Sequence, residues 1–270
     1  MRVVISTACQ TAKAGNREDE CEDRFQLPKN SNRRKKKFRF AVADGATESA
    51  FSGLWAQKLV SAYVNINPYK RKPTTTAELY KMVEENAPQW SKEVWAKPLT
   101  WFAQEKAQKG AFSTLLGLHL EDKPTLSYDG VWNALGTGDT CVFQIRQDEL
   151  IASFPIERPE QFNNRPALLS TNPLNNVALL EQPANLEITG TWQSGDRFLI
   201  MTDALANWFL NQTSEGKKSW ETDLSETAFI FPHQFENWLT ELRNAKTIRN
   251  DDVTLLMIRV EKDHEISRDG

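Results

Sequence analysis

The sequence is compatible with an α+β protein, since a strand-rich middle lies between two helical blocks. Alternating or continuous apolar residues over 38–43, 111–120 and 197–202 predict buried strands. Apolar residues instead recur at helical spacing over 74–108 and again around 235–242. We therefore expect two helical blocks attached to a strand-rich body.

The composition indicates a soluble globular protein. The 270 residues are 40% hydrophobic and 26% charged, and the net charge of −3 favours neither nucleic acid nor an anionic membrane. Cys9, Cys21 and Cys141 lack the spacing of a disulfide framework, and no apolar run approaches the ~20 residues of a membrane span. The apolar start is too short for a signal peptide. We expect a cytoplasmic protein with one domain over 1–262 and a charged tail over 263–270, its oligomeric state left open.

The first part of the chain predicts a strand at 2–9, an acidic segment at 18–23 and a short strand around Phe25. A basic loop at 33–37 precedes the strand at 38–43. A helix to about Val64 and a linker at 68–73 follow. We interpret the basic loop as solvated rather than as a binding site. The block at 74–108 predicts one or two helices, with breaks or kinks at Pro88 and Pro98. Its tryptophans (Trp90, Trp95 and Trp101) are expected in the core.

The second half predicts mainly strands. They fall at 111–120, 130–146, 150–154, 186–192, 197–202 and 253–260, with helices after Asp203 and around 235–242. The segment 158–183, rich in Asn and Pro, is expected to be an insertion or flap outside the core, and 211–226 a polar loop.

Carboxylates at strand ends are the candidate functional residues. The strand 38–43 ends on Asp44 with Gly45 behind it and a helix following, and Asp203 repeats this arrangement. Taken alone, Asp44 is as compatible with a turn as with a site. The full set comprises Glu22, Asp23, Asp44, Asp139, Asp203, Asp251 and Asp252. Converging carboxylates repel one another unless cations neutralise them, and oxygen ligands favour Mg²⁺ or Mn²⁺ over zinc.

Other chemistries find no support in the sequence. No GxSxG or GxxxxGK[ST] motif is present, and Gly136-Thr137-Gly138 opens no dinucleotide motif. The three histidines are scattered, and no His or Cys spacing matches a metal site. Each histidine is more compatible with a structural or solvated role.

The order of the acids resembles the metal-dependent protein phosphatases of the PP2C (PPM) type, in particular divergent bacterial members. The matching segments are Glu22-Asp23, 42–45, 110–114, 138–140, Gly195-Asp196 with 199–205, and 251–255. Each motif is weak by itself, but their shared order spans nearly the whole chain.

The resemblance implies a four-layer αββα sandwich, two antiparallel sheets flanked by helices, with a metal site at one end. It implies Mg²⁺- or Mn²⁺-dependent hydrolysis of phosphoserine and phosphothreonine in proteins. Asp44 and Asp23 would be the catalytic carboxylates. The implied metal ligands are Glu22, Asp23, Asp44, the Gly45 carbonyl, Asp203 and Asp251 for two ions, with Asp139 where some bacterial members hold a third.

The chain departs from the family pattern at several positions. Glu18 stands where the family often has a phosphate-binding arginine, so Arg17 is the candidate through a shifted loop. Ala46 replaces a histidine that some members use as a general acid; Ala204 and Asp252 replace the usual glycine and asparagine. Two alternatives stay open: a pseudophosphatase that binds or regulates a partner, and a structural domain with unrelated surface acids.

Overall fold

The computed structural model describes residues 1–31, 33–66, 76–163, 165–180 and 186–262. Strands form two five-stranded antiparallel sheets. In order across the first sheet, these are β1 (Arg2–Thr11), β12 (Val253–Glu261), β11 (Arg197–Met201), β7 (Cys141–Arg146) and β8 (Glu149–Phe154). Across the second sheet they are β10 (Glu187–Trp192), β6 (Gly130–Thr137), β5 (Leu115–Asp122), β3 (Lys37–Ala43) and β2 (Arg24–Gln26). The short strands β4 (Phe112–Ser113) and β9 (Leu169–Ser170) pair separately.

The two sheets pack face to face through a shared apolar layer. Phe38, Phe40 and Val42 of β3 belong to one buried cluster with Phe198 and Ile200 of β11. Alternate residues of the same strands point outward, as the two-residue strand period requires. Among those outward residues, Ala41 and Ala43 of β3 and Leu199 and Met201 of β11 are also apolar and buried, which explains the hydrophobic runs in the sequence; Arg39 of β3 is a buried charged exception.

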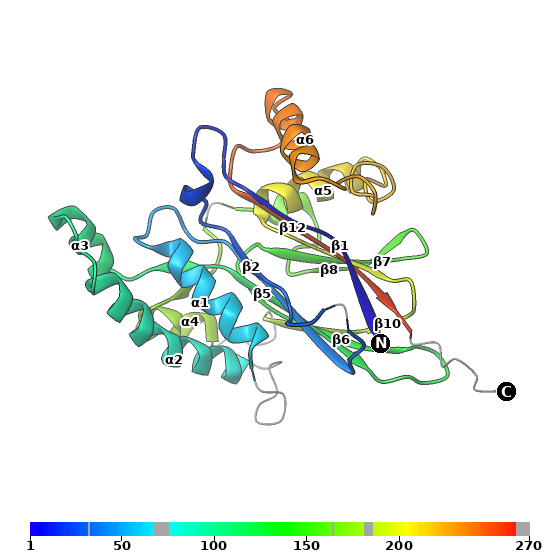
Figure 1. The fold of residues 1–270 in the computed structure, drawn as a ribbon, viewed down its shortest axis with the longest axis horizontal. Helices are drawn as coiled ribbons and strands as arrows, with labels where there is room; N and C mark the ends of the chain where they lie inside the picture. Colours follow the sequence, from blue (N-terminus) through cyan, green and yellow to red (C-terminus); the bar gives the residue numbers. More distant parts are fainter. Residues whose placement is uncertain (32, 67–75, 164, 181–185, 263–270) are drawn as a thin grey trace.

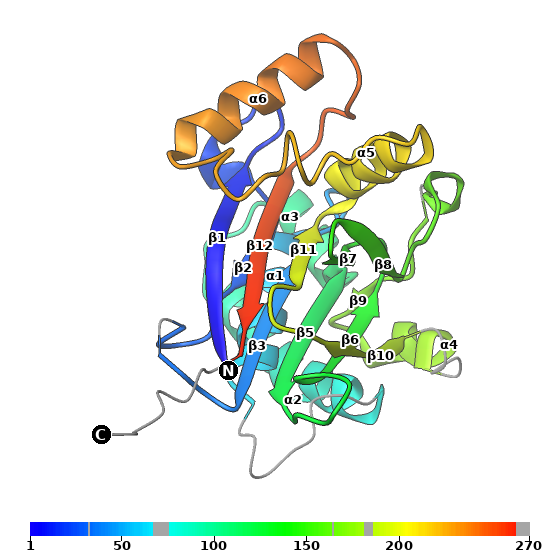
Figure 2. The same ribbon diagram turned by 90° about the vertical axis from the view of Figure 1, so that its right-hand side faces the viewer.

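Helices cover the outer face of each sheet (Figures 1 and 2). On the second sheet lie α1 (Ser52–Val64) and α2 (Thr76–Trp95), followed by α3 (Trp101–Gln108); on the first lie α5 (Asp203–Ser214) and α6 (Pro232–Asn244). The short helices are η1 (Glu18–Glu20), η2 (Pro159–Gln161), η3 (Pro173–Asn176) and α4 (Val177–Leu180). The predicted α+β sandwich of two antiparallel sheets flanked by helices is confirmed.

Two predictions for the first helical block hold only in part. The helix α2 continues through Pro88, and the break falls only between α2 and α3, where Pro98 lies. Trp90 is buried, but Trp95 and Trp101 are 45% and 76% exposed. The reason is position: α3 extends beyond the sheet (Figure 1), and Ala107 is its one buried residue.

Two predicted loops contribute to the interior. Within 158–183, Leu169 and Ser170 form β9 against β4, and Asn176 is buried, donating to and accepting from the backbone of Ser170. Within 211–226, α5 continues to Ser214 and the aromatic core includes Trp220. The predicted linker at 68–73 and tail at 263–270 lie outside the described residues. Among the described helices, each is too short or too polar to cross a bilayer.

Candidate metal centre

One end of the sandwich contains a cavity of about 430 Å³ whose lining is strongly acidic. Its lining includes Asp44 and Gly45 after β3, Asp139 before β7, Asp203 after β11 and Asp251 before β12. These residues come from four separate strand ends, so the sandwich brings together five of the predicted site positions. Asn163, Pro166 and Leu168 from the predicted flap segment line the same cavity.

The backbone of Asp44 is fixed on both sides, which leaves its carboxylate to face the cavity. Its amide donates to the Thr114 hydroxyl at 2.8 Å, and its carbonyl accepts from the Thr114 amide and the Ser113 hydroxyl, both at 2.8 Å. No hydrogen bond reaches the Asp44 carboxylate from the residues that the structure describes. The side chain is therefore positioned by its backbone and remains available for a ligand.

Only glycine fits at position 45, because neighbouring backbone atoms leave no room for a side chain. A Cβ at this position would lie 2.7 Å from the Ser52 carbonyl carbon and 2.9 Å from the Gly53 amide nitrogen, both backbone atoms that cannot easily shift. The close approach brings the first turn of α1 against the strand end. The Gly45 main chain thus lies directly beside the Asp44 carboxylate at the cavity wall.

Asp203 and Asp251 share one cation. Nη2 of Arg249 donates to Oδ2 of Asp203, and to Oδ2 of Asp251 at 2.8 Å. The other Asp203 oxygen accepts from the Ala204 amide at 2.5 Å, as expected at the first turn of α5. Arg249 is a site residue that the sequence analysis missed; the available signal was its place two residues before Asp251.

Glu22 and Asp23 lie behind the cavity rather than in its lining. Asp23 is fully buried; its Oδ2 accepts from the Thr254 hydroxyl at 2.9 Å, and its Oδ1 has no partner. The Glu22 carboxylate accepts from the Ser52 hydroxyl. Asp252 fixes this segment, since it accepts from the amides of Glu22 at 2.6 Å and Lys13 at 2.8 Å. An unpartnered buried carboxylate oxygen is costly, and a cation would relieve that cost.

Burial, and then mutual repulsion, makes these acids hard to ionise together. Burial first, and then the charges of Asp23, Asp203 and Asp139, raise the pKa of Asp44 well above its usual range. Burial and the Asp252 charge do the same for the pKa of Asp23. Burial and the neighbouring Asp203 raise the pKa of Asp139 to about 7. The pKa of Asp203 is also raised, mainly by burial, although Arg249 opposes the shift.

The oxygen atoms that line the cavity are of the chemical type that binds a hard divalent cation. The distances between them are larger than a bound ion requires. Within the described ranges, no three His, Cys, Asp or Glu side chains converge closely enough to hold a metal ion. Arg249 lies between two of these carboxylates, those of Asp203 and Asp251. The all-oxygen donors, the orphaned Asp23 oxygen and the arginine bridging two acids all indicate a site that needs positive charge.

Arg17 is placed differently from the other predicted site residues. Its side chain is 75% exposed, and its Nε and Nη2 each donate at 2.9 Å to Asp19. It does not line the cavity, whereas Arg249 does. Ala46 lines the cavity beside Gly45 and offers only a methyl group there.

Comparisons with known proteins agree with this architecture. The sequence profile of the family described as Protein phosphatase 2C matches residues 12–244. No curated relative matches the chain.

Solved structures of phosphatases share the fold at low sequence identity. The photosystem II phosphatase PBCP is 15% identical with a TM-score of 0.58, over 96% of this chain and 99% of that one. The catalytic domain of the serine/threonine protein phosphatase PstP, solved with 2 manganese ions, is 14% identical with a TM-score of 0.57, over 96% and 99%. The phosphatase domain of SpoIIE from Bacillus subtilis is 14% identical with a TM-score of 0.51, over 100% and 96%. With the family profile matching most of its length, the chain belongs to the protein phosphatase 2C family.

Proposed function

We propose that this protein hydrolyses phosphoserine and phosphothreonine in proteins and depends on Mg²⁺ or Mn²⁺. The observation that supports this is the acidic cavity lined by Asp44, Asp139, Asp203 and Asp251, in a chain of the protein phosphatase 2C family. We further propose that residues 1–262 act as one cytoplasmic phosphatase domain.

Two ions would be held by Asp44 and the Gly45 carbonyl together with Asp203 and Asp251 on one side, and Glu22 and Asp23 on the other; Asp139 would hold a third. When bound, such ions neutralise phosphoryl oxygens and lower the pKa of a coordinated water. The chain itself supplies position. The hydrogen bonds of Thr114 and Ser113 hold Asp44 in place, and Asp252 fixes the backbone of Glu22.

The surroundings of the Asp44 and Asp23 carboxyl groups suit them to a catalytic role, because they alter the strength of their charges and their pKa values. Asp23 is inaccessible to water, so its charge is only weakly screened in low-dielectric surroundings. The raised pKa values of both carboxyl groups mean that ionising them is unfavourable in the absence of cations. With divalent cations bound, the ionised forms of Asp44 and Asp23 would be favoured.

The test is hydrolysis of a phosphoserine peptide with Mn²⁺, with EDTA, and with the variants Asp44→Asn and Asp203→Asn. We expect EDTA and each variant to lower turnover by about 10²-fold or more, the loss typical when transition-state charge stabilisation is removed. The matched control is Asp148→Asn, a similar change at an exposed aspartate outside the cavity. Equal turnover in EDTA or in both variants would refute the proposal.

Calorimetry distinguishes the pseudophosphatase alternative. Mn²⁺ binding to the wild type without turnover of any phosphopeptide would favour a binding or regulatory role. The absence of Mn²⁺ binding would favour a structural domain.

A further inference from the structure

Arg249 is the cationic residue in the lining of the acidic cavity, where it faces Asp44, Glu48, Asp139, Asp203 and Asp251. Its side chain is 52% exposed, so the guanidinium is not locked into the interior. One nitrogen, Nη2, bridges Asp203 and Asp251. Arg249 thus supplies part of the positive charge that the carboxylates need.

The guanidinium retains unused donors. An arginine has five N–H groups, of which two belong to Nη2. Nε and Nη1 donate no hydrogen bond to any residue that the structure describes. These groups form a planar fork that suits two oxygens of a phosphoryl group.

A divalent cation would compete with Arg249 for the same two acids. Asp203 and Asp251 are the expected metal ligands, and both are engaged by Nη2. A metal ion at these carboxylates would take the partners of the guanidinium and repel its charge. The side chain, anchored two residues from Asp251, would then remain at the cavity with all its donors free.

We propose that Arg249 is exchanged for a divalent cation at Asp203 and Asp251, and that the released guanidinium then binds the phosphoryl group of the substrate. The inference rests on the proposed function of the cavity. It gives Arg249 the role for which the sequence offered Arg17, whose Nε and Nη2 donate to Asp19 outside the cavity.

Calorimetry tests both halves of the exchange without requiring turnover. In Arg249→Ala, we expect Mn²⁺ to bind about tenfold more tightly, because its competitor is gone, and inorganic phosphate to bind the Mn²⁺-loaded protein about tenfold more weakly. In Arg249→Lys, the charge is kept and the fork is lost. We therefore expect Mn²⁺ affinity near that of the wild type and weaker phosphate binding.

The matched control is Arg259→Gln. Arg259 is also shared by two acids, Glu226 and Glu261, both at 3.0 Å, but it lies outside the acidic cavity. We expect this variant to change neither affinity. Thermal unfolding of each metal-free variant checks that it is folded.

Opposite shifts in the two affinities are the signature of exchange. A parallel loss of both affinities in Arg249→Ala would assign Arg249 a purely structural role and overturn the inference. A tenfold loss of phosphate affinity in Arg17→Ala with none in Arg249→Ala would also overturn it. If the opposite shifts appear in a protein without phosphatase turnover, the exchange stands and the proposed function falls. Failure of the wild type to bind Mn²⁺ would reject both.

Discussion

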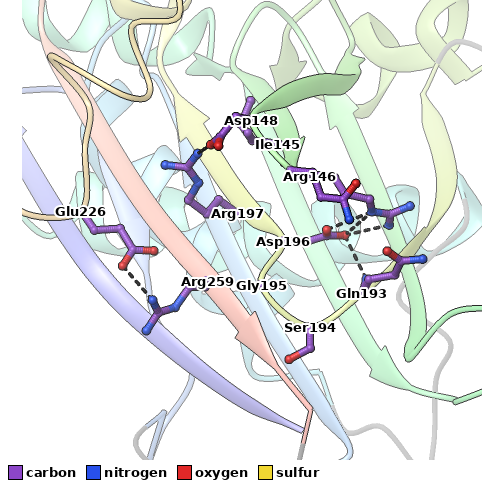
Figure 3. A pocket seen from close by; sticks show the side chains of 11 residues that line it. Ile145, Arg146, Asp148, Gln193, Ser194, Gly195, Asp196, Arg197, Glu226 and Arg259 are labelled. Atoms are coloured by element: carbon purple, nitrogen blue, oxygen red, sulfur yellow. Dashed lines mark hydrogen bonds and ion pairs between the residues drawn. The ribbon is translucent and has the colours of Figure 1, made fainter.

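The two ends of β11 show arginine–carboxylate contacts of opposite character. At its start, Arg197 lies in a pocket of about 420 Å³ with Arg146 and Arg259 (Figure 3). Just after its end, Asp203 lies in the acidic cavity with Arg249. The same kinds of residue occur in both places, but their proportions differ.

At the start of β11, the charges in the pocket are balanced. Figure 3 shows Arg146 with Asp196, Arg197 with Asp148 and Arg259 with Glu226. Asp196 is 1% exposed and accepts from Arg146 Nε at 2.9 Å and Nη2 at 2.8 Å, from Gln144 at 2.7 Å and from the Gln193 amide at 3.0 Å. With these donors, the hydrogen-bonding capacity of the buried Asp196 carboxylate is satisfied, as expected of a structural residue.

Beyond the end of β11, the carboxylates outnumber the cations. Five acids of the cavity lining face Arg249, and the pKa values of Asp44, Asp139 and Asp203 are raised rather than lowered. Raised pKa values mean that the protein has not stabilised these charges by itself. The comparison teaches that balanced charge marks structure, whereas unbalanced buried charge marks a site that needs a ligand.

The largest expected effect on stability comes from the balanced end. Asp196→Ala leaves Arg146 and Gln144 without their buried acceptor, so we expect the free energy of unfolding to fall by about 3–5 kcal/mol. Urea unfolding measures the loss. Mn²⁺ affinity of the folded variant should stay within about twofold, since Asp196 is far from the cavity along β11. A loss below about 1 kcal/mol would contradict the structural role.

The acidic cavity should give the metal-free protein an unusual dependence on pH. The folded-state pKa of Asp139 is about 7, which is above its unfolded value. The folded-state pKa values of Asp23, Asp44 and Asp203 are also raised. The folded state therefore binds more protons, and stability falls as pH rises from about 5 to 7, by up to about 1.4 kcal/mol per pH unit for each proton.

Thermal unfolding across this pH range checks the prediction, with and without Mn²⁺. Mn²⁺ should reduce the slope, because a bound cation stabilises the ionised carboxylates. Asp139→Asn should reduce it in the metal-free protein. A metal-free protein that becomes steadily more stable between pH 5 and 7 would show that the acids are already compensated.

Removing one surplus acid should stabilise the metal-free protein. Asp23→Asn preserves the shape and the acceptor for Thr254 while removing a fully buried charge beside Asp252. We expect the free energy of unfolding to rise by about 1–2 kcal/mol at pH 7.5, and Mn²⁺ binding to weaken. Urea unfolding and calorimetry measure the two effects. A destabilisation as large as that of Asp196→Ala would erase the distinction between the two ends.

The smallest effect should come from the exposed member of the balanced pocket. Asp148 is 60% exposed, pairs with Arg197 at 2.9 Å and has a φ of 59°, which asparagine also tolerates. We expect Asp148→Asn to change the free energy of unfolding by less than about 0.5 kcal/mol. Urea unfolding is again the measurement. A larger loss would mean that the ion pairs around this pocket act as one network.

The sequence determined the strand-rich and helical blocks of the chain and the positions of the strand-end acids. The runs ending at Asp44 and Asp203 were recognisable because both faces of β3 and β11 are buried, one between the sheets and one under helices. Burial on both faces favours apolar residues, with Arg39 of β3 as an exception, and an acidic residue directly after such a run then marks the strand end. This local rule needs no knowledge of the tertiary structure.

Tertiary structure alone decided which helical aromatic residues are buried. Trp90 and Trp101 both lie in helices, but α2 lies on the sheet, whereas α3 extends past it. Helical spacing gives the side that an aromatic residue faces, without indicating whether anything packs there. Pro88 likewise lies within α2, whose buried residues Met82, Val83 and Trp90 flank it and favour a continuous helix.

Tertiary structure also decided the roles of neighbouring polar residues at the site. Asp251 lines the cavity, whereas the adjacent Asp252 turns away to accept from the amides of Lys13 and Glu22. Consecutive side chains in extended backbone point to opposite sides, so adjacent acids separate into a candidate ligand and a structural acceptor. Arg17 and Arg249 differ for a similar reason. Each lies two residues before an aspartate, Asp19 or Asp251, but only the loop before β12 enters the cavity. The sequence determined that acids stand at the strand ends; the packing of the two sheets decided which charges meet there.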